Sequence, residues 1–392
     1  MSAKPPIVYV APWSWEALYN RSQPLALALA RAGHRVLYVQ PREEAYPAED
    51  ASRSRRWLRS PRSRVTLSPG PHPLLSLVEV RSEKRRAAVP LSSDFSPPAR
   101  AALETRLKRE FRGQKATLIS SRPQLYSFFD YPLWSRIALD MEDPWLELSW
   151  GQNPYAVIRI RQAIDRADAC FANGVAIADF FRERLGAKVH SLPNGVESAT
   201  LETLLAPLPR PAALDKGANR FRVCFLGKIN DRIHFSLLAQ VLPQAKDTDF
   251  YFVGQAVILE KDKAAWQSLL AAPNCFHVGL VPFEQVPAFL THSDALLLPY
   301  TEAGGAKMFP AKLLEYVAAR KPIIATHVPA ELALLSEAFH TYDSPQSLGN
   351  LLEALASAGM ALDPQLAREC LAFAQAATWD HRASELVAEL YA

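Results

Sequence analysis

Two stretches in the second half of the sequence combine glycines with basic side chains. The first holds Gly227, Lys228 and Arg232, and the second holds Gly304, Gly305, Lys307 and Lys312. Glycine lets the backbone approach a ligand closely, and the free N–H groups at the start of a helix attract anions. Because Lys307 and Lys312 add full positive charges, the second stretch is suited to binding a phosphate or a diphosphate.

Glu315 lies three residues after Lys312, so both side chains project from one face of a predicted helix. A carboxylate repels phosphate but accepts hydrogen bonds from hydroxyl groups such as those of a ribose. A phosphate at the helix start with sugar hydroxyls beside it would suit a nucleoside diphosphate. An ordinary strand–helix–strand unit with charged surface residues shows the same pattern, and the residues alone leave both interpretations open.

Three acidic residues mark the end of a predicted strand at residues 136–140: Asp140 is its last residue, and Glu142 and Asp143 follow it. In open α/β sheets, ligands bind at the carboxyl ends of the strands. A carboxylate surrounded by like charges can have a raised pKa and act as a base, so each of these carboxylates is a candidate. Two alternatives remain: a metal site, for which no other hard ligands converge in the sequence, and helix capping by the Asp before Pro144.

Trp13, Trp15 and Trp145 stand beside predicted strand ends in the first half of the chain. Flat aromatic rings there could stack on an acceptor sugar or lipid, although tryptophan is usually packed in a core. The turn that carries Trp13 and Trp15 also holds Ser14 and Asn20, which we include among the acceptor-binding candidates.

Short apolar runs alternate with helical patterns along the chain, which is typical of α/β domains. We expect strands at residues 7–10, 35–40, 117–120, 136–140, 168–172, 188–192, 221–226, 249–254, 275–279, 294–299 and from 323. We expect helices at 25–31, after 232 to about 242, from Pro310 to 320, and near 345–358 and 364–391. A chain of 392 residues is long enough for two such domains.

The composition is that of a globular protein, with 49% hydrophobic and 21% charged residues and a net charge of +4. No apolar stretch is long enough to span a membrane, and the N-terminus lacks the pattern of a signal peptide. The four cysteines are far apart in apolar segments, which favours free thiols in a reducing cytoplasm. The turn after the first strand contains no glycine, which argues against a dinucleotide site, and no P-loop motif occurs.

Six arginines from Arg53 to Arg64 surround Trp57 and Leu58, and no acidic residue occurs between Ala51 and Val78. Such a cluster could dock on an anionic membrane surface. No nucleic-acid recognition module accompanies it, so we expect no nucleic-acid partner. A solvated loop rich in Ser and Pro is the other interpretation.

The run Phe309-Pro310-x-Lys312-Leu313-x-Glu315-Tyr316-x-Ala318-x-x-Lys321-Pro322 resembles the donor-site helix of retaining GT-B glycosyltransferases of family four. The resemblance implies that Glu315 binds the donor ribose and that the helix start meets the diphosphate. It also implies that Lys228 and Arg232 reach the diphosphate and that residues 276–281, ending at Val281, lie beside the nucleobase. Many members carry a second glutamate eight residues before the first, where this chain has Lys307.

Shorter features fit the same resemblance. Glycosyltransferases of the teichuronic-acid type carry an Asp-x-x-Asp segment similar to the one formed by Asp140 and Asp143. This resemblance favours Asp143, and after it Asp140, as the catalytic residue that assists at the acceptor or the reacting sugar. The motif Pro193-Asn194-Gly195-Val196 recurs in the family at the end of the first domain. Gly254, at the end of a predicted strand, joins Gly227 among the donor-binding candidates.

The resemblance implies a GT-B fold, with two Rossmann-like doubly wound parallel-sheet domains that face a cleft. We expect an acceptor domain at 1–200, a nucleotide-sugar donor domain at 201–370 and a helix at 371–392 that returns to the first domain. The expected location is the cytoplasm, with peripheral contact at the inner face of the membrane through Arg53–Arg64.

The expected reaction moves a sugar from a nucleoside-diphosphate donor to a hydroxyl acceptor, with retained configuration. The acceptor would be a sugar, a lipid-linked molecule or a small molecule, in polysaccharide, glycolipid or other glycoconjugate biosynthesis. We expect no cofactor and no metal. The alternatives are a nucleotide-sugar epimerase or hydrolase of the same fold and a non-catalytic nucleotide-sugar-binding protein.

Overall fold

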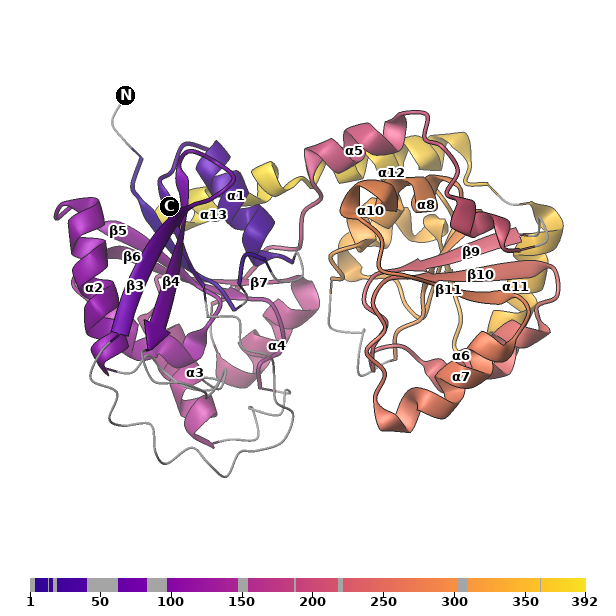
Figure 1. Cartoon of the computed structure of the whole chain (residues 1–392), viewed down its shortest axis with the longest axis horizontal. Helices are drawn as coiled ribbons and strands as arrows, with labels where there is room; N and C mark the ends of the chain where they lie inside the picture. Colours follow the sequence, from indigo (N-terminus) through magenta and orange to yellow (C-terminus); the bar gives the residue numbers. More distant parts are fainter. Residues whose placement is uncertain are drawn as a thin grey trace. The chain divides into compact units, whose positions relative to one another are not determined.

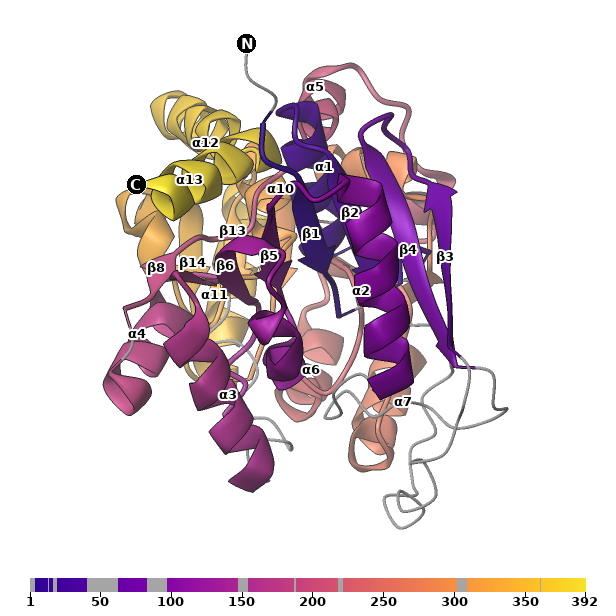
Figure 2. The same cartoon turned by 90° about the vertical axis from the view of Figure 1, so that its left-hand side faces the viewer.

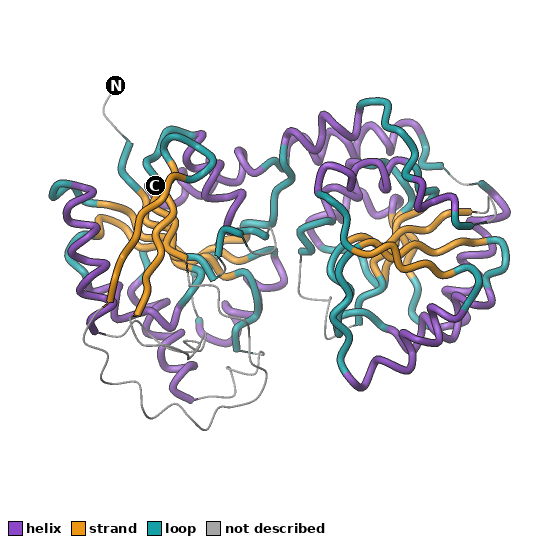
Figure 3. The backbone as a smooth tube through the Cα atoms, in the orientation of Figure 1, coloured by secondary structure: helices purple, strands orange, loops and turns teal. Residues whose placement is uncertain are grey.

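The computed structural model describes residues 4–12, 14–16, 20–40, 63–82, 97–146, 154–186, 188–217, 221–301, 309–359 and 361–392. The chain folds into two compact units. Unit 1 comprises Met1–Pro193 and Trp379–Ala392, and unit 2 comprises Asn194–Thr378. Within each unit a sheet forms the centre and helices cover it (Figure 1 and Figure 3).

Unit 1 is built on an eight-stranded sheet with the order β3-β4-β2-β1-β5-β6-β7-β8. Its strands are β1 (Ile7–Val10), β2 (Val36–Gln40), β3 (Ser63–Pro69), β4 (Leu75–Ser82), β5 (Ala116–Ser120), β6 (Trp134–Met141), β7 (Ala169–Ala172) and β8 (His190–Ser191). β3 and β4 pair antiparallel, and all other neighbours are parallel. The chain leaves β1 for β2 and returns to the other side of β1 as β5, so the switch point, where such sheets bind ligands, lies at the carboxyl ends of β1 and β5.

Helices cover both faces of this sheet (Figure 2). They are α1 (Ser22–Arg31) and α13 (Trp379–Tyr391) on one face, and α2 (Pro97–Phe111), α3 (Pro154–Arg166) and α4 (Val175–Leu185) on the other. Alternation along the strands supplies both cores. In β1, Ile7 and Tyr9 pack under α1 and α13, whereas Val8 and Val10 pack under the other helices.

The β3–β4 hairpin was not expected from the sequence. Its alternating apolar residues include Val65 and Leu67 in β3 and Leu75 and Leu77 in β4, and the register pairs Leu67 with Val78. Neighbouring arginines, serines and prolines obscured this alternation, because they suggested a solvated loop. The arginines from Arg53 to Arg62 lie outside the described residues, so the predicted membrane contact stays a prediction.

Unit 2 holds a six-stranded, fully parallel sheet with the order β11-β10-β9-β12-β13-β14. Its strands are β9 (Phe221–Leu226), β10 (Thr248–Val253), β11 (Cys275–Gly279), β12 (Ala295–Leu298), β13 (Ile323–Ala325) and β14 (Phe339–Thr341). The chain leaves β9 for β10 and later returns to the other side of β9 as β12. The switch point of this sheet therefore lies at the carboxyl ends of β9 and β12.

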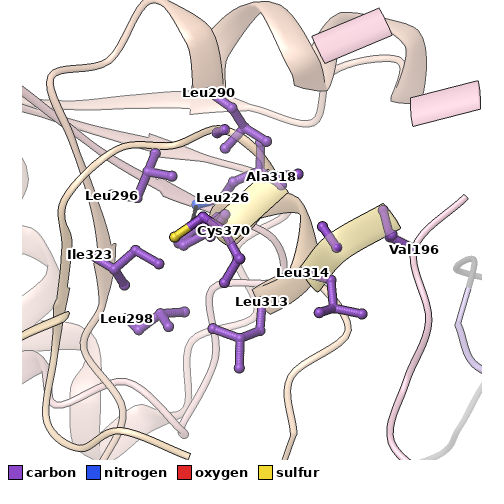
Figure 4. Close-up of a cluster of buried hydrophobic side chains, with 14 of the residues drawn as sticks. Val196, Leu226, Leu290, Leu296, Leu298, Leu313, Leu314, Ala318, Ile323 and Cys370 are labelled. Carbon is purple, nitrogen blue, oxygen red and sulfur yellow. Dashed lines mark hydrogen bonds between the residues drawn. The ribbon is translucent and has the colours of Figure 1, made fainter. Parts of the chain in front are cut away.

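Two helical layers cover the second sheet (Figure 1). They are α5 (Ser198–Leu205), α8 (Val286–Thr291), α10 (Leu313–Ala318) and α12 (Pro364–Ala376) on one face, and α6 (Phe235–Val241), α7 (Lys263–Ala271) and α11 (Pro345–Ala358) on the other. Figure 4 shows the core of the first layer, where Leu296 and Ile323 from the sheet meet Leu314 of α10 and Cys370 of α12. This packing holds α10 over the ends of the strands.

The units divide after Pro193 and after Thr378, whereas the sequence suggested divisions after 200 and after 370. The helical stretch expected at 364–391 is broken into α12 and α13. α13 packs against α1 in unit 1, with Trp379 and Leu386 buried in the same cluster as Leu25. No helix among the described residues is long and apolar enough to cross a bilayer.

Candidate functional site

The loops after β9 and β10 touch each other so closely that glycine is required at two positions. A Cβ atom on Gly254, where φ is +141°, would lie 2.1 Å from the carbonyl oxygen of Gly227. Gly227 has a φ of +121°, and its N–H donates to the Val253 carbonyl at 2.8 Å. Both glycines therefore have a packing reason at the carboxyl edge of the sheet. Their contact with a donor stays a prediction.

Lys312 reaches this glycine pair from the start of α10. Its Nζ lies 3.8 Å from the centre of the Phe225 ring and 5.5 Å from that of the Tyr300 ring. A Cβ atom on Gly227 would approach Nζ to 2.5 Å, so the glycine also makes room for the ammonium group. Burial lowers the pKa of Lys312 to about 7, against the attraction of the neighbouring Glu315. The aromatic faces favour the cation, but they replace only part of its lost hydration.

Glu315 lies in the same electrostatic environment, one turn further along the chain. Burial raises the pKa of its carboxyl group to about 7, and the charge of Lys312 partly offsets the shift. Two oppositely charged groups that both titrate near neutral pH can adjust their charge to a ligand. Clusters of this kind are typical of functional sites.

Arg232 joins this pair through the two loops at the switch point. Its carbonyl oxygen accepts the N–H of Thr301 at 2.8 Å, and an isolated antiparallel bridge pairs Ile233 with Tyr300. The loop after β9 and the loop after β12 are thus held together. The charge of Arg232 contributes to the low pKa of Lys312, so Arg232, Lys312 and Glu315 belong to one cluster at the strand ends.

The other donor candidates are placed less completely. Lys228 is exposed directly after Gly227, and Val281 is half-buried after β11, where it packs against the core. Gly304, Gly305 and Lys307 lie outside the described residues. Their predicted contact with phosphate, and the consequence of Lys307 at the family's glutamate position, stay predictions.

α10 begins at Leu313 rather than at the predicted Pro310. The N–H of Leu313 donates to the Pro310 carbonyl at 3.0 Å, so residues 310–312 form a turn, and the helix has only six residues. Asn194 fixes the entry to this turn by donating from Nδ2 to the Phe309 carbonyl at 2.8 Å. Because a short helix has a small dipole, we assign most of the positive charge here to Lys312 rather than to the helix start.

In unit 1, Asp140 is fully buried and its two oxygens are both occupied. Oδ1 accepts from Arg21 Nε at 2.8 Å, and Oδ2 accepts from the Tyr9 hydroxyl at 2.6 Å. These contacts tie β6 to the start of α1 and to β1. Both oxygens of Asp140 are therefore engaged within unit 1, as in a structural ion pair, and a catalytic role for Asp140 stays a prediction.

Glu142, at the same edge of the sheet, has a carboxyl group with a raised pKa. It was not among the catalytic residues predicted from the sequence. Burial, followed by the charge of Asp140, raises the pKa of Glu142 to about 8, whereas Arg21 and a hydrogen bond from Ser121 lower it. Residues 138, 140 and 142 alternate onto one face of the strand, and this spacing was the feature of the sequence that could have placed Glu142 beside Asp140. Asp143, the first catalytic candidate, is half-buried, and its carbonyl oxygen accepts the Trp145 N–H at 2.8 Å.

The acceptor candidates divide into two groups. Trp15 is half-buried, and its ring packs edge-to-face on that of Tyr38 with 4.9 Å between the ring centres. Its backbone N–H donates to the side-chain oxygen of Gln40 at 2.7 Å. Ser14 is buried, and Asn20 accepts from the Ser22 hydroxyl at 2.9 Å, so both residues order the turn before α1.

Trp145 lies in the core instead. It is 3% exposed and packs edge-to-face on Phe181, so its ring is not available to a sugar. Trp13 lies outside the described residues. Within the described part of the chain, no group of three or more His, Cys, Asp or Glu residues could hold a metal ion, and independence from metals stays a prediction.

Comparison with known proteins relates part of the sequence to a family and the fold to solved structures. Residues 220–357 match the family described as Glycosyl transferases group 1, so unit 2 carries a glycosyl transferases group 1 domain. The fold as a whole is the GT-B fold of such enzymes.

Among individual proteins, the chain is similar to TuaH of Bacillus subtilis (strain 168), a candidate teichuronic acid biosynthesis glycosyltransferase. The two are 27% identical over 224 residues, which cover 52% of this chain and 55% of TuaH. The matched part thus spans about half the length of that curated relative.

Solved structures extend the likeness over the whole chain. Anabaena Alr3699/HepE in complex with UDP has a TM-score of 0.66 at 14% identity, covering 98% of this chain and 99% of that one. The E. coli trehalose-6-phosphate structure bound with UDP-2-fluoro glucose has a TM-score of 0.64 at 12% identity, covering 98% of each chain. At these identities the likeness is one of fold.

Proposed function

We propose that this protein is a glycosyltransferase that moves a sugar from a nucleoside-diphosphate donor to a hydroxyl acceptor. The observation that carries the proposal is the cluster of Arg232, Lys312 and Glu315 around the glycine pair of unit 2. It lies at the switch point of a parallel sheet, within the segment that matches the glycosyl transferases group 1 family.

The donor would be held by its diphosphate and its ribose. Lys228, Lys312 and Arg232 would stabilise the negative charge that develops on the diphosphate as the glycosidic bond breaks. Glu315 would accept hydrogen bonds from the ribose hydroxyls. Two structural neighbours hold UDP and UDP-2-fluoro glucose, so uridine nucleotides are the first donors to test.

The acceptor side of the proposal is less specific. The relative TuaH supports a role in polysaccharide biosynthesis, in which acceptors carry free hydroxyl groups. We propose a sugar, lipid-linked or small-molecule acceptor, transfer with retained configuration, and no requirement for a cofactor or metal. Peripheral contact with the inner face of a membrane through Arg53–Arg64 belongs to the same proposal.

The experiment uses a panel of donors and a matched pair of variants. Wild type is incubated with UDP-glucose, UDP-galactose, UDP-N-acetylglucosamine and GDP-mannose, with and without alkyl glycosides as acceptors, and nucleotide release and product are measured. In Glu315→Gln a charged hydrogen bond to the ribose is lost, so affinity for the preferred nucleotide should fall by about 1–3 kcal/mol, or roughly 5- to 150-fold. Glu353→Gln, an exposed residue of α11 on the opposite face of the sheet, is the control and should bind like wild type.

Each alternative function has its own outcome. Nucleotide release or sugar conversion that needs no acceptor would indicate an epimerase or hydrolase. Thermal stabilisation by a nucleotide sugar without turnover on any acceptor would indicate a binding protein. If Glu315→Gln keeps wild-type affinity, the ribose role is wrong.

A further inference from the structure

The carboxyl edge of unit 1 holds a polar cluster that the donor site does not use. Tyr9 of β1 and Tyr38 of β2 stack at 5.9 Å, and their hydroxyls point to two different partners. The Tyr9 hydroxyl donates to Asp140, while the Tyr38 hydroxyl lies 2.9 Å from that of Ser22 at the start of α1. These groups lie at the switch point of the sheet, where such folds bind ligands.

Within this cluster, the contacts of Asp140 and Glu142 differ. Asp140 is neutralised by Arg21 and uses both of its oxygens. Glu142 receives a hydrogen bond from Ser121, but its Oε1 is buried and has no hydrogen-bond partner among the residues that the structure describes. A buried polar atom without a partner is costly, and native sites that keep one usually have a ligand or a catalytic role for it.

The surroundings of Glu142 indicate which ligand would complete it. Asp140 and Asp143 place negative charge beside it, and Tyr9 and Tyr38 contribute only hydroxyl groups. An anion such as phosphate would be repelled, and Arg21, the cation that the described residues place beside Glu142, is already paired with Asp140. A neutral hydroxyl group is not repelled by the carboxylates and needs no cation as a partner, and it can donate a hydrogen bond to Oε1.

We propose that Glu142 binds the acceptor hydroxyl in unit 1 and takes its proton during sugar transfer. The proposal rests on the proposed function. It assigns to Glu142 the catalytic role that the sequence suggested for Asp140, with Asp143 beside it. The residue as a whole is half-buried, so an acceptor can approach it from the solvent side.

Sugar transfer forms one bond and breaks another. The acceptor oxygen forms a bond to the anomeric carbon of the donor sugar on the face from which the diphosphate departs, as retained configuration requires, and the bond from that carbon to the β-phosphate oxygen breaks. The electron pair of the broken bond leaves with the nucleoside diphosphate, and the acceptor proton passes to the Glu142 carboxylate, which later releases it to water. With its pKa at about 8, Glu142 is ionised in roughly a tenth of molecules at pH 7, and it is a stronger base than an ordinary carboxylate.

The test compares Glu142→Gln with Glu183→Gln, an exposed glutamate of α4 that serves as the matched control. Both are assayed with the active donor of the panel and octyl glucoside as the acceptor probe, together with UDP binding and thermal unfolding. Glu142→Gln should fold and bind UDP like wild type but lose about 100-fold or more in acceptor-dependent kcat, because glutamine keeps the shape and cannot take a proton. The wild-type kcat should rise with pH up to about 8, and the residual rate of Glu142→Gln should not follow this rise.

Infrared difference spectra give a readout that does not depend on the acceptor. Wild type at pH 6 should show the C=O band of a protonated carboxylic acid that is missing in Glu142→Gln and fades as the pH passes about 8.

The outcomes separate this proposal from the function on which it rests. If wild type transfers no sugar, the proposed function fails and the assignment of Glu142 fails with it. If wild type transfers sugar and Glu142→Gln does so within about threefold with the same pH profile, only the assignment of Glu142 is overturned. A rate that depends on added Mg²⁺ in wild type and not in Glu142→Gln would also overturn it, since it would assign Glu142 to a metal.

Discussion

Lys312 should lower the free energy of unfolding of the protein while it contributes to binding the diphosphate of the donor. Replacing it with methionine tests this directly. Its ammonium group lies against Phe225 and Tyr300 with its pKa lowered to about 7 by burial. Methionine has a similar length, packs well on aromatic rings and carries no charge. We therefore expect Lys312→Met to be more stable than wild type and to bind UDP less tightly.

The size of the gain follows from the pKa. An unfolded lysine titrates at 10.5, and every tenfold change in proton affinity corresponds to about 1.4 kcal/mol, so a pKa of about 7 sets an upper limit on the order of 5 kcal/mol. The cation–π contact is lost with the charge, and Lys312 is not sealed from water, so we expect about 2 kcal/mol. Because the pKa is lowered in the folded state, the cost of Lys312 is full below pH 7 and disappears as the pH rises towards 10.5.

The assay is denaturant unfolding of the full chain at pH 6, 8 and 10, with Lys246→Met as the control. Lys246 is an exposed residue before β10 and should give a small difference that does not change with pH. At pH 6, Glu315 is mostly protonated, since its own pKa is about 7, so removing Lys312 leaves little unpaired charge. The advantage of Lys312→Met should be largest there and close to zero at pH 10.

Two results would refute this reasoning. A Lys312→Met protein that is less stable than wild type at pH 6 would mean that the ammonium group is well solvated or well paired. A difference that stays constant from pH 6 to pH 10 would show that the change in packing, and not the charge, determines the effect.

Four further predictions address other groups. Asp140→Ala should lower the free energy of unfolding by about 3–5 kcal/mol in chemical denaturation, because it leaves Arg21 buried without its partner. Gly254→Ala should cost at least about 1–3 kcal/mol in the same assay, because of the positive φ and the contact with the neighbouring loop. UDP binding at pH 8 should take up protons, as measured by calorimetry in two buffers, and this uptake should be smaller in Lys312→Met, because the diphosphate favours the charged lysine. Relative to Glu142→Gln, wild type should lose stability as the pH rises from about 4.5 to about 8, since the folded carboxyl group holds its proton and the unfolded one does not; equal pH profiles would contradict the raised pKa.

Much of the architecture follows from local patterns. Apolar runs such as Ile7–Val10 and Ala295–Leu298 are buried on both faces of parallel sheets, and such strands are the easiest to predict. The glycine and charge patterns around Gly227 and Glu315 lie at the carboxyl edge of the sheet, where the ends of neighbouring parallel strands meet, and their contact with a donor stays a prediction.

The remaining features depend on contacts that are distant in sequence. The burial of Asp140 depends on Arg21 and Tyr9, which come more than a hundred residues earlier, and no local pattern shows that pairing. The perturbation of Glu142 follows from the same cluster. The turn before α10 is contacted by Asn194, which donates to the Phe309 carbonyl from the start of unit 2, more than a hundred residues earlier.

The last helix has a consequence for how the polypeptide matures as it is synthesised. Unit 2 is inserted into unit 1, and its two ends meet where Val196 pairs with Thr378. All of unit 2 has therefore been translated by Thr378, whereas unit 1 still lacks α13, which covers Tyr9 and Leu25 and places Trp379 under Arg21. Unit 1, whose strands are translated before unit 2, is thus completed only when α13 follows, and a truncation that removes α13 would uncover Tyr9 and take Trp379 away from Arg21, the partner of Asp140.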